Sequence, residues 1–265
     1  MAQTATGDAS APLLRIEDLA VQFDGVTALD GVSFEVFPRE IVGIIGPNGA
    51  GKTTLFNCLS RFYKEDRGDI AIAGRSIVRT PPHRIVTLGL SRTFQNLALF
   101  DKLSVLDNVM LGGHRGTSGN VLSDALQLPS VRRRDARMEA AAWELLRYLN
   151  LEAVAHRHVG DLPFGTQKRV EIARALAASP KLLLLDEPAG GLNHQEVKQL
   201  GSLILRIREE RDVAVLLVEH HMGLVMSISD RVVVLNFGRL IAQGKPKEIT
   251  QNPDVIRAYL GAPAA

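Results

Sequence analysis

The chain has 265 residues, of which 46% are hydrophobic and 23% charged, and its formal net charge is +2. This length and composition are typical of a soluble globular protein with room for one large domain and an insertion. The single cysteine, Cys58, excludes an internal disulfide framework, suits a reducing cytoplasm and is interpreted as a packing residue. The small net charge does not by itself indicate a nucleic-acid partner.

The first part of the chain predicts a tail followed by a small β-rich region. Residues 1–12 are small and polar, without a basic start or an apolar stretch, so we expect a disordered tail and no signal peptide. Residues 13–23 and 32–36 alternate between apolar and polar side chains, which predicts strands. No window reaches the ~20 apolar residues that cross a bilayer, so we expect any work at a membrane to depend on a partner protein.

A phosphate-binding loop follows. It matches the pattern G-x-x-x-x-G-K-[ST] with the residues Gly46-Pro47-Asn48-Gly49-Ala50-Gly51-Lys52-Thr53. Residues 41–45 predict a buried strand before it, and residues 54–60 predict the first turns of a helix after it. Glycine turns and the helix N-terminus aim backbone N–H groups at an anion. We expect the whole loop and Thr54 to bind a nucleoside triphosphate, with Lys52 on the β- and γ-phosphates and Thr53 on Mg²⁺.

The middle of the chain predicts mostly helix. Residues 70–74 predict one more short strand. A long helix is predicted over residues 135–150 by the helical spacing of Met138, Ala142, Leu145 and Leu149. Trp143 on this helix is interpreted as a packing residue. The three arginines at 132–134 are interpreted as a solvated basic turn before the helix, in preference to a contact with lipid headgroups.

The last third alternates between strand and helix. The predicted strands are residues 182–185, 213–218 and 232–235, and the predicted helices lie near 195–210 and 222–228. This alternation is typical of an α/β core with a parallel sheet.

Two carboxylates follow the strand over residues 182–185, at Asp186 and Glu187, and Pro188 ends the strand. In open α/β sheets, ligands bind beyond the carboxyl ends of the strands. Asp186 is therefore suited to hold Mg²⁺, and Glu187 is suited to polarise the water that attacks the γ-phosphate.

With these motifs in this order, residues 13–261 resemble the ATP-binding subunits of ABC transporters. The resemblance implies an α/β fold: a P-loop NTPase core with a RecA-like parallel sheet, an antiparallel β subdomain and an inserted α-helical subdomain. It assigns the core and β subdomain to residues 13–95 and 179–245, the helical signature subdomain to 96–178, and a C-terminal helix and tail to 246–265.

The resemblance also implies roles for single residues. Phe23 would stack on adenine, where tyrosine is more common. Gln95 would sense the γ-phosphate and Mg²⁺, and His220 would hydrogen-bond the γ-phosphate. The implied catalytic set is Glu187, His220, Gln95 and Lys52, and the implied metal ligands are Thr53, Gln95 and Asp186. Residues 189–193 resemble the loop that crosses the dimer interface, with Asn193 where aspartate is commoner.

The family signature is altered in this chain. Residues 162–167 read Leu-Pro-Phe-Gly-Thr-Gln, where Leu-Ser-Gly-Gly-Gln-Gln is usual. Pro163 replaces the serine whose hydroxyl would reach the γ-phosphate bound in the opposing subunit. The resemblance implies that Gly165, Thr166 and Gln167 contact that nucleotide, helped by the positive end of the following helix. Thr166 either supplies a substitute hydroxyl or caps that helix.

Several stretches resemble the ATPase subunits of branched-chain, or hydrophobic, amino acid importers (the Liv group). They are residues 187–193, 219–226, 114–134 and 252–261. This resemblance implies ATP and Mg²⁺ as ligands, two integral-membrane permease subunits, a second ATPase subunit that is identical or paralogous, and an indirect link to a periplasmic or extracellular solute-binding protein. It places the chain peripherally at the cytoplasmic face of the inner membrane, with no nucleic acid as partner.

Other functions stay open at this stage. They are an ATPase for lipopolysaccharide export or urea and amide uptake, a soluble ABC ATPase that acts on ribosomes or DNA, and a nucleotide-binding subunit without catalysis. The adjacent His220 and His221 would point to different sides of a regular element. His156 and His158 have no cysteine or carboxylate at ligand spacing, so we expect no metal other than Mg²⁺.

Overall fold

The computed structural model of the protein describes residues 11–93, 97–114 and 129–260. Most of the predicted N-terminal tail, Gln95 and much of the segment 114–134 lie outside these ranges. Among the residues described, no helix is long and apolar enough to cross a bilayer.

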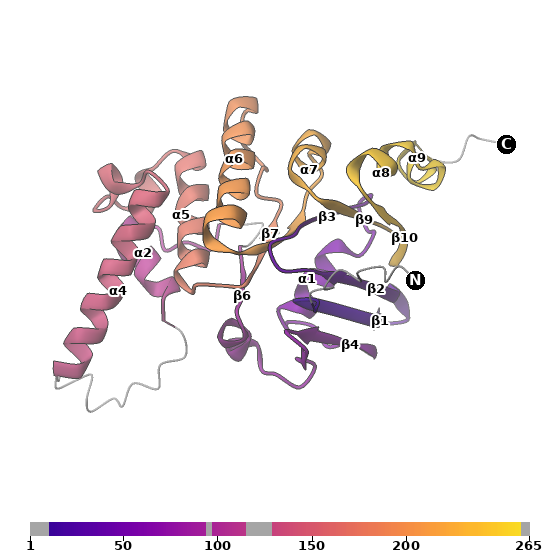
Figure 1. Cartoon of the computed structure of the whole chain (residues 1–265), viewed down its shortest axis with the longest axis horizontal. Coiled ribbons are helices and arrows are strands. Elements are labelled where there is room, and N and C mark those ends of the chain that lie inside the picture. Colours follow the sequence, from indigo (N-terminus) through magenta and orange to yellow (C-terminus); the bar gives the residue numbers. More distant parts are fainter. Residues whose placement is uncertain (1–10, 94–96, 115–128, 261–265) are drawn as a thin grey trace, which may run out of the picture.

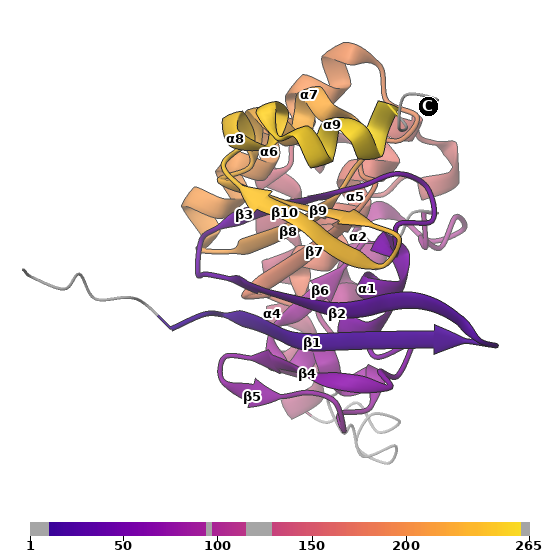
Figure 2. The same cartoon turned by 90° about the vertical axis from the view of Figure 1, so that its right-hand side faces the viewer.

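An antiparallel sheet forms the first layer. Its strands are β1 (Leu14–Phe23), β2 (Val26–Val36), β4 (Arg67–Ile72) and β5 (Arg75–Ser76), in the order β2-β1-β4-β5. Figure 2 shows this sheet below the second, larger sheet. The predicted β-rich region is confirmed, and the second strand begins six residues earlier than its alternation indicated, at Val26.

The second sheet is parallel except for one edge strand. Its strands are β3 (Ile41–Ile45), β6 (Leu90–Arg92), β7 (Leu182–Asp186), β8 (Ala214–Val218), β9 (Arg231–Asn236) and β10 (Arg239–Gly244), in the order β10-β9-β3-β8-β7-β6. Only β10 runs antiparallel. Every residue of β3, β7 and β8 is buried, as expected for parallel strands covered on both faces. The predicted α/β fold with a parallel sheet is confirmed.

Helices cover both faces of the parallel sheet. They are α1 (Lys52–Leu59), α2 (Val105–Gly112), α4 (Pro129–Tyr148), α5 (Phe164–Ala177), α6 (His194–Arg211), α7 (Met222–Ile228), α8 (Pro246–Gln251) and α9 (Pro253–Leu260). Figures 1 and 2 show α1 between the two sheets, and Figure 1 shows α2, α4 and α5 together beyond the β6 edge.

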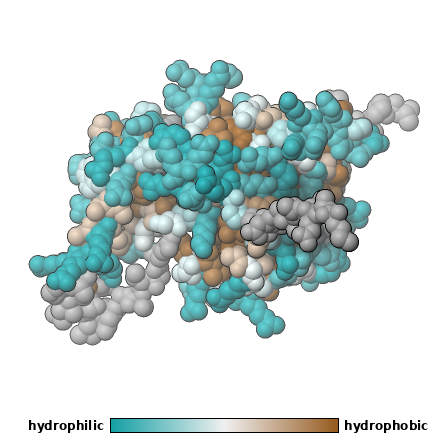
Figure 3. All heavy atoms as spheres, viewed as in Figure 1, coloured by the Kyte–Doolittle hydropathy of each residue, from teal (hydrophilic) through white to brown (hydrophobic). Residues whose placement is uncertain are grey.

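Alternate residues of each parallel strand belong to two different hydrophobic clusters. In β7, Leu182 and Leu184 pack with α1 and the antiparallel sheet, while Leu183 and Leu185 pack with α5 and α6. Residues 182–185 of this strand are therefore all apolar, because each face of the strand belongs to a core. The surface seen in Figure 3 is mostly hydrophilic, with smaller apolar areas between the polar ones.

Two packing interpretations are confirmed. Cys58 is fully buried in α1, and burial raises the pKa of its thiol from 9.0 to about 12. Trp143 packs against the core, and its ring contacts that of His156 edge to face, with centroids 5.6 Å apart.

Two expectations about helices are corrected. Residues 132–134 lie inside α4 and not in a turn, because this helix already begins at Pro129, and arginine and proline are both compatible with its first turns. The C-terminal segment forms two short helices where one was expected. Pro253 lacks the N–H needed to continue α8, and the side chain of Asn252 accepts a hydrogen bond from the backbone of Asp254 (2.8 Å) to start α9.

Candidate active site

Three loops that carry predicted site residues leave the parallel sheet side by side. The ends of β3, β8 and β7 are in register, because Ile44 pairs with Val218 and Val218 pairs with Asp186. The phosphate loop follows β3, His220 follows β8 and Glu187 follows β7. The structure therefore brings these residues to one edge of the sheet, beyond the carboxyl ends of the strands, where open α/β folds bind ligands.

The side chain of Lys52 is folded into the phosphate loop. Its ammonium group donates hydrogen bonds to the backbone carbonyls of Gly46 (2.6 Å) and Pro47 (3.0 Å). Burial lowers the pKa of this ammonium, while the charge of the Glu187 carboxylate acts to raise it. The loop thus holds a buried cation within electrostatic reach of Glu187, at the start of a helix whose N-terminus favours an anion.

Gly46 and Gly51 have no room for a side chain, because neighbouring backbone lies against them. A Cβ atom on Gly46 would lie 2.2 Å from the carbonyl oxygen of Leu235, and one on Gly51 would lie 2.6 Å from that of Ala28. Gly51 also has a φ of 99°, a conformation that favours glycine. These glycines therefore let the loop lie directly against β9 and β2.

Glu187 and His220 lie next to each other. Glu187 has a left-handed backbone conformation (φ 45°), and its N–H donates to the carbonyl of Val218 (2.9 Å). Its Oε2 lies 3.8 Å from Nδ1 of His220. The His220 side chain is 66% exposed and that of Glu187 is 25% exposed, so both are accessible to an incoming ligand.

The proposed metal ligands that the structure describes are oxygen donors. Thr53 lies exposed in the first turn of α1, and Asp186 ends β7 with a buried carboxylate. Hydroxyl and carboxylate oxygens are the ligands that Mg²⁺ prefers, so these residues fit that ion. Gln95 lies outside the described residues, and its place in this set stays a prediction.

Arg92, which was not among the predicted site residues, pairs with the carboxylate of Asp186. Its guanidinium donates to Oδ2 of Asp186 at 2.7 Å, and the two side chains are only 7% and 4% exposed. The same guanidinium donates to Oδ1 of Asn57 (2.9 Å) and Oγ of Ser60 (3.1 Å). Arg92 thereby joins the end of β6 to α1 and places a cation beside a proposed metal ligand.

Arg92→Ala is expected to lower the free energy of unfolding by about 3–5 kcal/mol, because it removes the cation that faces a buried carboxylate. Arg67→Ala is the matched control, since Arg67 pairs with Asp18 at 2.7 Å while the two side chains are 59% and 60% exposed. Such an exposed pair contributes about 0–1 kcal/mol. Urea unfolding measures both variants, and equal losses would contradict the buried ionic contact.

Phe23 and Tyr63 form a pair of partly exposed rings. They meet edge to face with centroids 5.0 Å apart, and they are 42% and 39% exposed. Each ring therefore has a surface on which a flat base stacks. Phe23 alone was predicted to contact adenine, and Tyr63 is an additional candidate for that contact.

The altered signature lies at the first turn of α5. Pro163 is the N-cap residue and provides no side-chain cap. Thr166 lies within the helix, where its Oγ1 accepts a hydrogen bond from Nη2 of Arg169 (3.4 Å). The alternative that Thr166 caps this helix is therefore wrong, because the helix already begins at Phe164.

The rest of the signature packs against the segment that follows Glu187. A Cβ atom on Gly191 would lie 2.8 Å from the ring of Phe164, and one on Gly165 would lie 2.5 Å from Oε1 of Glu196. Gln167 donates from Nε2 to a backbone carbonyl just before the helix (2.9 Å). The bulky Phe164 is thus accommodated by a glycine on the facing loop.

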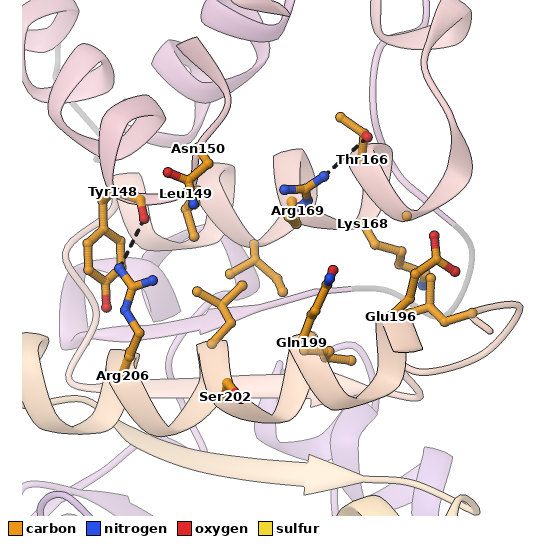
Figure 4. Close-up of a pocket in the computed structure, with 15 residues that line it drawn as sticks. Tyr148, Leu149, Asn150, Thr166, Lys168, Arg169, Glu196, Gln199, Ser202 and Arg206 are labelled. Atoms are coloured by element: carbon orange, nitrogen blue, oxygen red, sulfur yellow. Dashed lines mark hydrogen bonds between the residues drawn. The ribbon is translucent and has the colours of Figure 1, made fainter. Parts of the chain in front are cut away.

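A cavity of about 400 Å³ lies beside the signature, between α5 and α6. Figure 4 shows Thr166 and Arg169 above it and Gln199 and Arg206 below it, on α6. Arg206 reaches Tyr148 of α4, donating to its backbone carbonyl at 3.2 Å, with the guanidinium 4.7 Å from the ring centroid. This contact links the end of α4 to α6.

Comparison with known proteins assigns the family. A sequence model described as "ABC transporter" matches residues 29–190. The chain is 46% identical over 254 residues to the high-affinity branched-chain amino acid transport ATP-binding protein BraF of Pseudomonas aeruginosa, covering 95% of this chain and 99% of that one. This chain belongs to the ABC transporter ATPases.

Further matches agree with this family. LivG of Escherichia coli, also a high-affinity branched-chain amino acid transport ATP-binding protein, is 44% identical with the same coverage. A solved ATP-binding cassette of an ABC transporter in its ADP conformation is 30% identical, with a TM-score of 0.82 over 96% of this chain and all of that one. A second model, "Branched-chain amino acid ATP-binding cassette transporter", matches residues 239–265. As an ABC transporter ATPase, the chain binds and hydrolyses ATP, and its fold is that of a P-loop NTPase.

Proposed function

We propose that this chain is the ATP-hydrolysing subunit of an ABC importer that takes up branched-chain amino acids or related solutes. The observation that carries the proposal is the juxtaposition of Lys52, Glu187 and His220 at one edge of the sheet. The solute class rests on the similarity to BraF and LivG and on the match of the C-terminal segment.

The arrangement supports a hydrolytic role for each group. Lys52 and the N-terminus of α1 would bind the β- and γ-phosphates, and His220 would donate a hydrogen bond to the γ-phosphate. Glu187 would accept a proton from the attacking water. Mg²⁺, held by Thr53, Asp186 and Gln95, would neutralise phosphate charge. Phe23 and Tyr63 would hold the adenine.

The signature supports a working pair of ATPase subunits, which are two copies of this chain or one copy and a paralogue. Gly165 lies in the first turn of α5, where the first backbone N–H groups of a helix have no acceptor within it, and Thr166 and Gln167 follow with their N–H groups donating to the carbonyl of Pro163 (2.8 and 3.0 Å). This helix end would face the phosphate of a nucleotide bound by the opposing subunit. ATP binding would thus close the pair, and hydrolysis would release it.

A partly apolar groove is proposed as the permease contact. It has a volume of about 370 Å³ and is lined in part by Phe62, Phe100, Leu111 and Arg174. The three apolar side chains are 53%, 56% and 42% exposed, and exposed apolar groups of this size favour a partner surface. An amphipathic permease segment would fit here, which would hold the chain peripherally at the cytoplasmic face of the inner membrane. The solute-binding protein would act through the permease, and no nucleic acid is proposed.

Co-purification and transport together test the function. An affinity-tagged chain purified from membranes should bring two permease subunits and a second ATPase, identified by mass spectrometry. The reconstituted complex should take up labelled leucine, isoleucine or valine only with ATP inside the vesicle. Uptake of another solute class, with these three amino acids excluded, would contradict the proposed substrate while leaving the ATPase role in place.

Pro163→Ser is expected to strengthen ATP-driven dimerisation by about 10- to 100-fold, because a hydrogen bond to a charged group contributes about 1.5–3 kcal/mol. Sedimentation of the ATP-bound protein in a Glu187→Gln background measures the change. Pro246→Ser is the control, since Pro246 also lies at a helix start, as the first residue of α8, but away from the signature. Unchanged dimerisation in this background, together with unchanged turnover of Pro163→Ser when Glu187 is intact, would show that the serine hydroxyl is dispensable here.

A further inference from the structure

Glu219 is a buried carboxylate that the proposed site has not used. It follows β8, directly before His220, and is only 1% exposed. Its own backbone N–H faces the carbonyl of Ile44 in β3 at 3.4 Å. A carboxylate removed from water in this way is costly unless hydrogen bonds compensate for the lost hydration.

Three backbone N–H groups donate hydrogen bonds to the Glu219 carboxylate and compensate for its lost hydration. Oε1 accepts from the N–H of Ala189 at 2.6 Å. Oε2 accepts from the N–H of His220 at 3.0 Å and from that of His221 at 3.1 Å. Hydrogen bonds to an ionised acceptor are about twice as strong as neutral ones, so this side chain is a firm connection between the backbone segments that it touches.

The two segments are those that position the hydrolytic groups. Ala189 lies two residues after Glu187, and His220 is the residue whose side chain approaches Glu187 to 3.8 Å. The Glu219 carboxylate therefore connects the backbone of the loop after β7 to the backbone of the loop after β8. The side chains of Glu187 and His220 are partly exposed, while the backbones of their loops are held by the same buried carboxylate.

We propose that Glu219 is a positioning residue for ATP hydrolysis, which fixes Glu187 and His220 relative to each other through the backbones of their loops. This inference rests on the proposed hydrolytic role of Glu187. Glu219 itself touches neither the water nor the phosphate, so it should affect turnover far more than ATP binding, which depends mainly on the phosphate loop.

Two substitutions test separately the charge and the length of the Glu219 side chain. Glu219→Gln keeps the size of the side chain but replaces one acceptor oxygen by an NH₂ group. That group would face N–H donors of one of the two loops, so the hydrogen bonds to that loop are lost. Glu219→Asp keeps the charge but is one methylene shorter, so it is too short to reach both loops. A displacement of about 1 Å at a catalytic group lowers turnover by about 10²-fold, and we expect both variants to lose about 10- to 100-fold in kcat with KM for ATP within about twofold of wild type.

Glu40→Gln is the matched control. Glu40 is also a largely buried carboxylate (14% exposed) that accepts a backbone N–H, from Phe37 at 2.8 Å, and pairs with Arg231 at 2.9 Å. It precedes β3, at the end of the strand opposite the phosphate loop. Glu40→Gln should lower the thermal unfolding temperature without lowering kcat. A loss of kcat in the Glu219 variants no larger than in this control would overturn the proposal.

A double-mutant cycle tests whether Glu219 acts through His220. Single-turnover ATP hydrolysis is measured for Glu219→Gln, His220→Ala and the combination. A positioning role predicts that Glu219→Gln lowers the rate less in the His220→Ala background than in the wild type, whereas fully additive losses would overturn it. A different result would contradict the proposed function. If Glu187→Gln hydrolysed ATP at the wild-type rate, the hydrolytic role of Glu187 would be wrong, whatever the Glu219 variants do.

Discussion

Glu187→Gln is expected to bind ATP as tightly as the wild type and to lower kcat by about 10²–10⁴-fold, the usual contribution of a general base. Glutamine keeps the length and an acceptor oxygen of the side chain but does not take up a proton from water. The backbone of residue 187 is held by the carbonyl of Val218 (2.9 Å), so the side chain should keep its place beside His220. Phosphate release measures kcat, and titration with a fluorescent ATP analogue measures affinity.

Glu209→Gln is the control for this loss. Glu209 is a 59% exposed carboxylate on α6 that pairs with Arg208, so its replacement should change neither kcat nor affinity. A Glu187→Gln protein that also loses ATP affinity would indicate a binding role for the carboxylate in place of proton transfer. Hydrolysis at the wild-type rate would remove Glu187 from the mechanism.

The parallel strands and the loops after them were predictable because burial and turn geometry restrict the residues that fit there. Residues 182–185 of β7 and all five residues of β8 are buried between two layers, so they form apolar runs, and such runs stand out in a sequence. The phosphate loop passes so close to neighbouring backbone that glycine is required at Gly46 and Gly51. Both constraints are local, so both are visible in a single sequence.

The short edge elements were not predictable in this way. β5 has two residues and β6 has three, and neither is long enough to show an alternation. β10 pairs only with β9 in the sheet, at its edge, and its residues are mostly half-exposed or exposed. These strands form because a neighbour offers hydrogen-bonding partners, and a local pattern does not contain that information.

The supporting contacts of the site were also missed, since they join residues far apart in the chain. Arg92 pairs with Asp186 across 94 positions, and Glu219 binds the backbone of Ala189 across 30. Phe164 was identified as an anomaly in the signature, yet its accommodation by Gly191 depends on how α5 meets the facing loop. The available signals in the sequence were the charges of Arg92, shortly before Gln95, and of Glu219, directly before His220. The charge of a residue does not by itself reveal which residue it contacts.

Lys52→Ala is expected to weaken ATP binding by about 10²-fold or more. The ammonium is the buried cation of the phosphate loop, and each hydrogen bond between a charged donor and a phosphate contributes about 1.5–3 kcal/mol, with 1.4 kcal/mol for each factor of ten. In the structure the group is held by the carbonyls of Gly46 and Pro47. The substitution therefore removes a phosphate contact and also leaves two loop carbonyls without this donor.

Lys181→Ala separates loss of a phosphate contact from loss of a positive charge in general. Lys181 is exposed and precedes β7, at the end of the sheet opposite the phosphate loop, so its replacement should leave ATP affinity unchanged. Thermal unfolding without nucleotide checks that Lys52→Ala still folds. If Lys52→Ala folds and binds ATP like the wild type, the phosphate-loop assignment is wrong, because no other contact in the proposed site is expected to replace that buried ammonium.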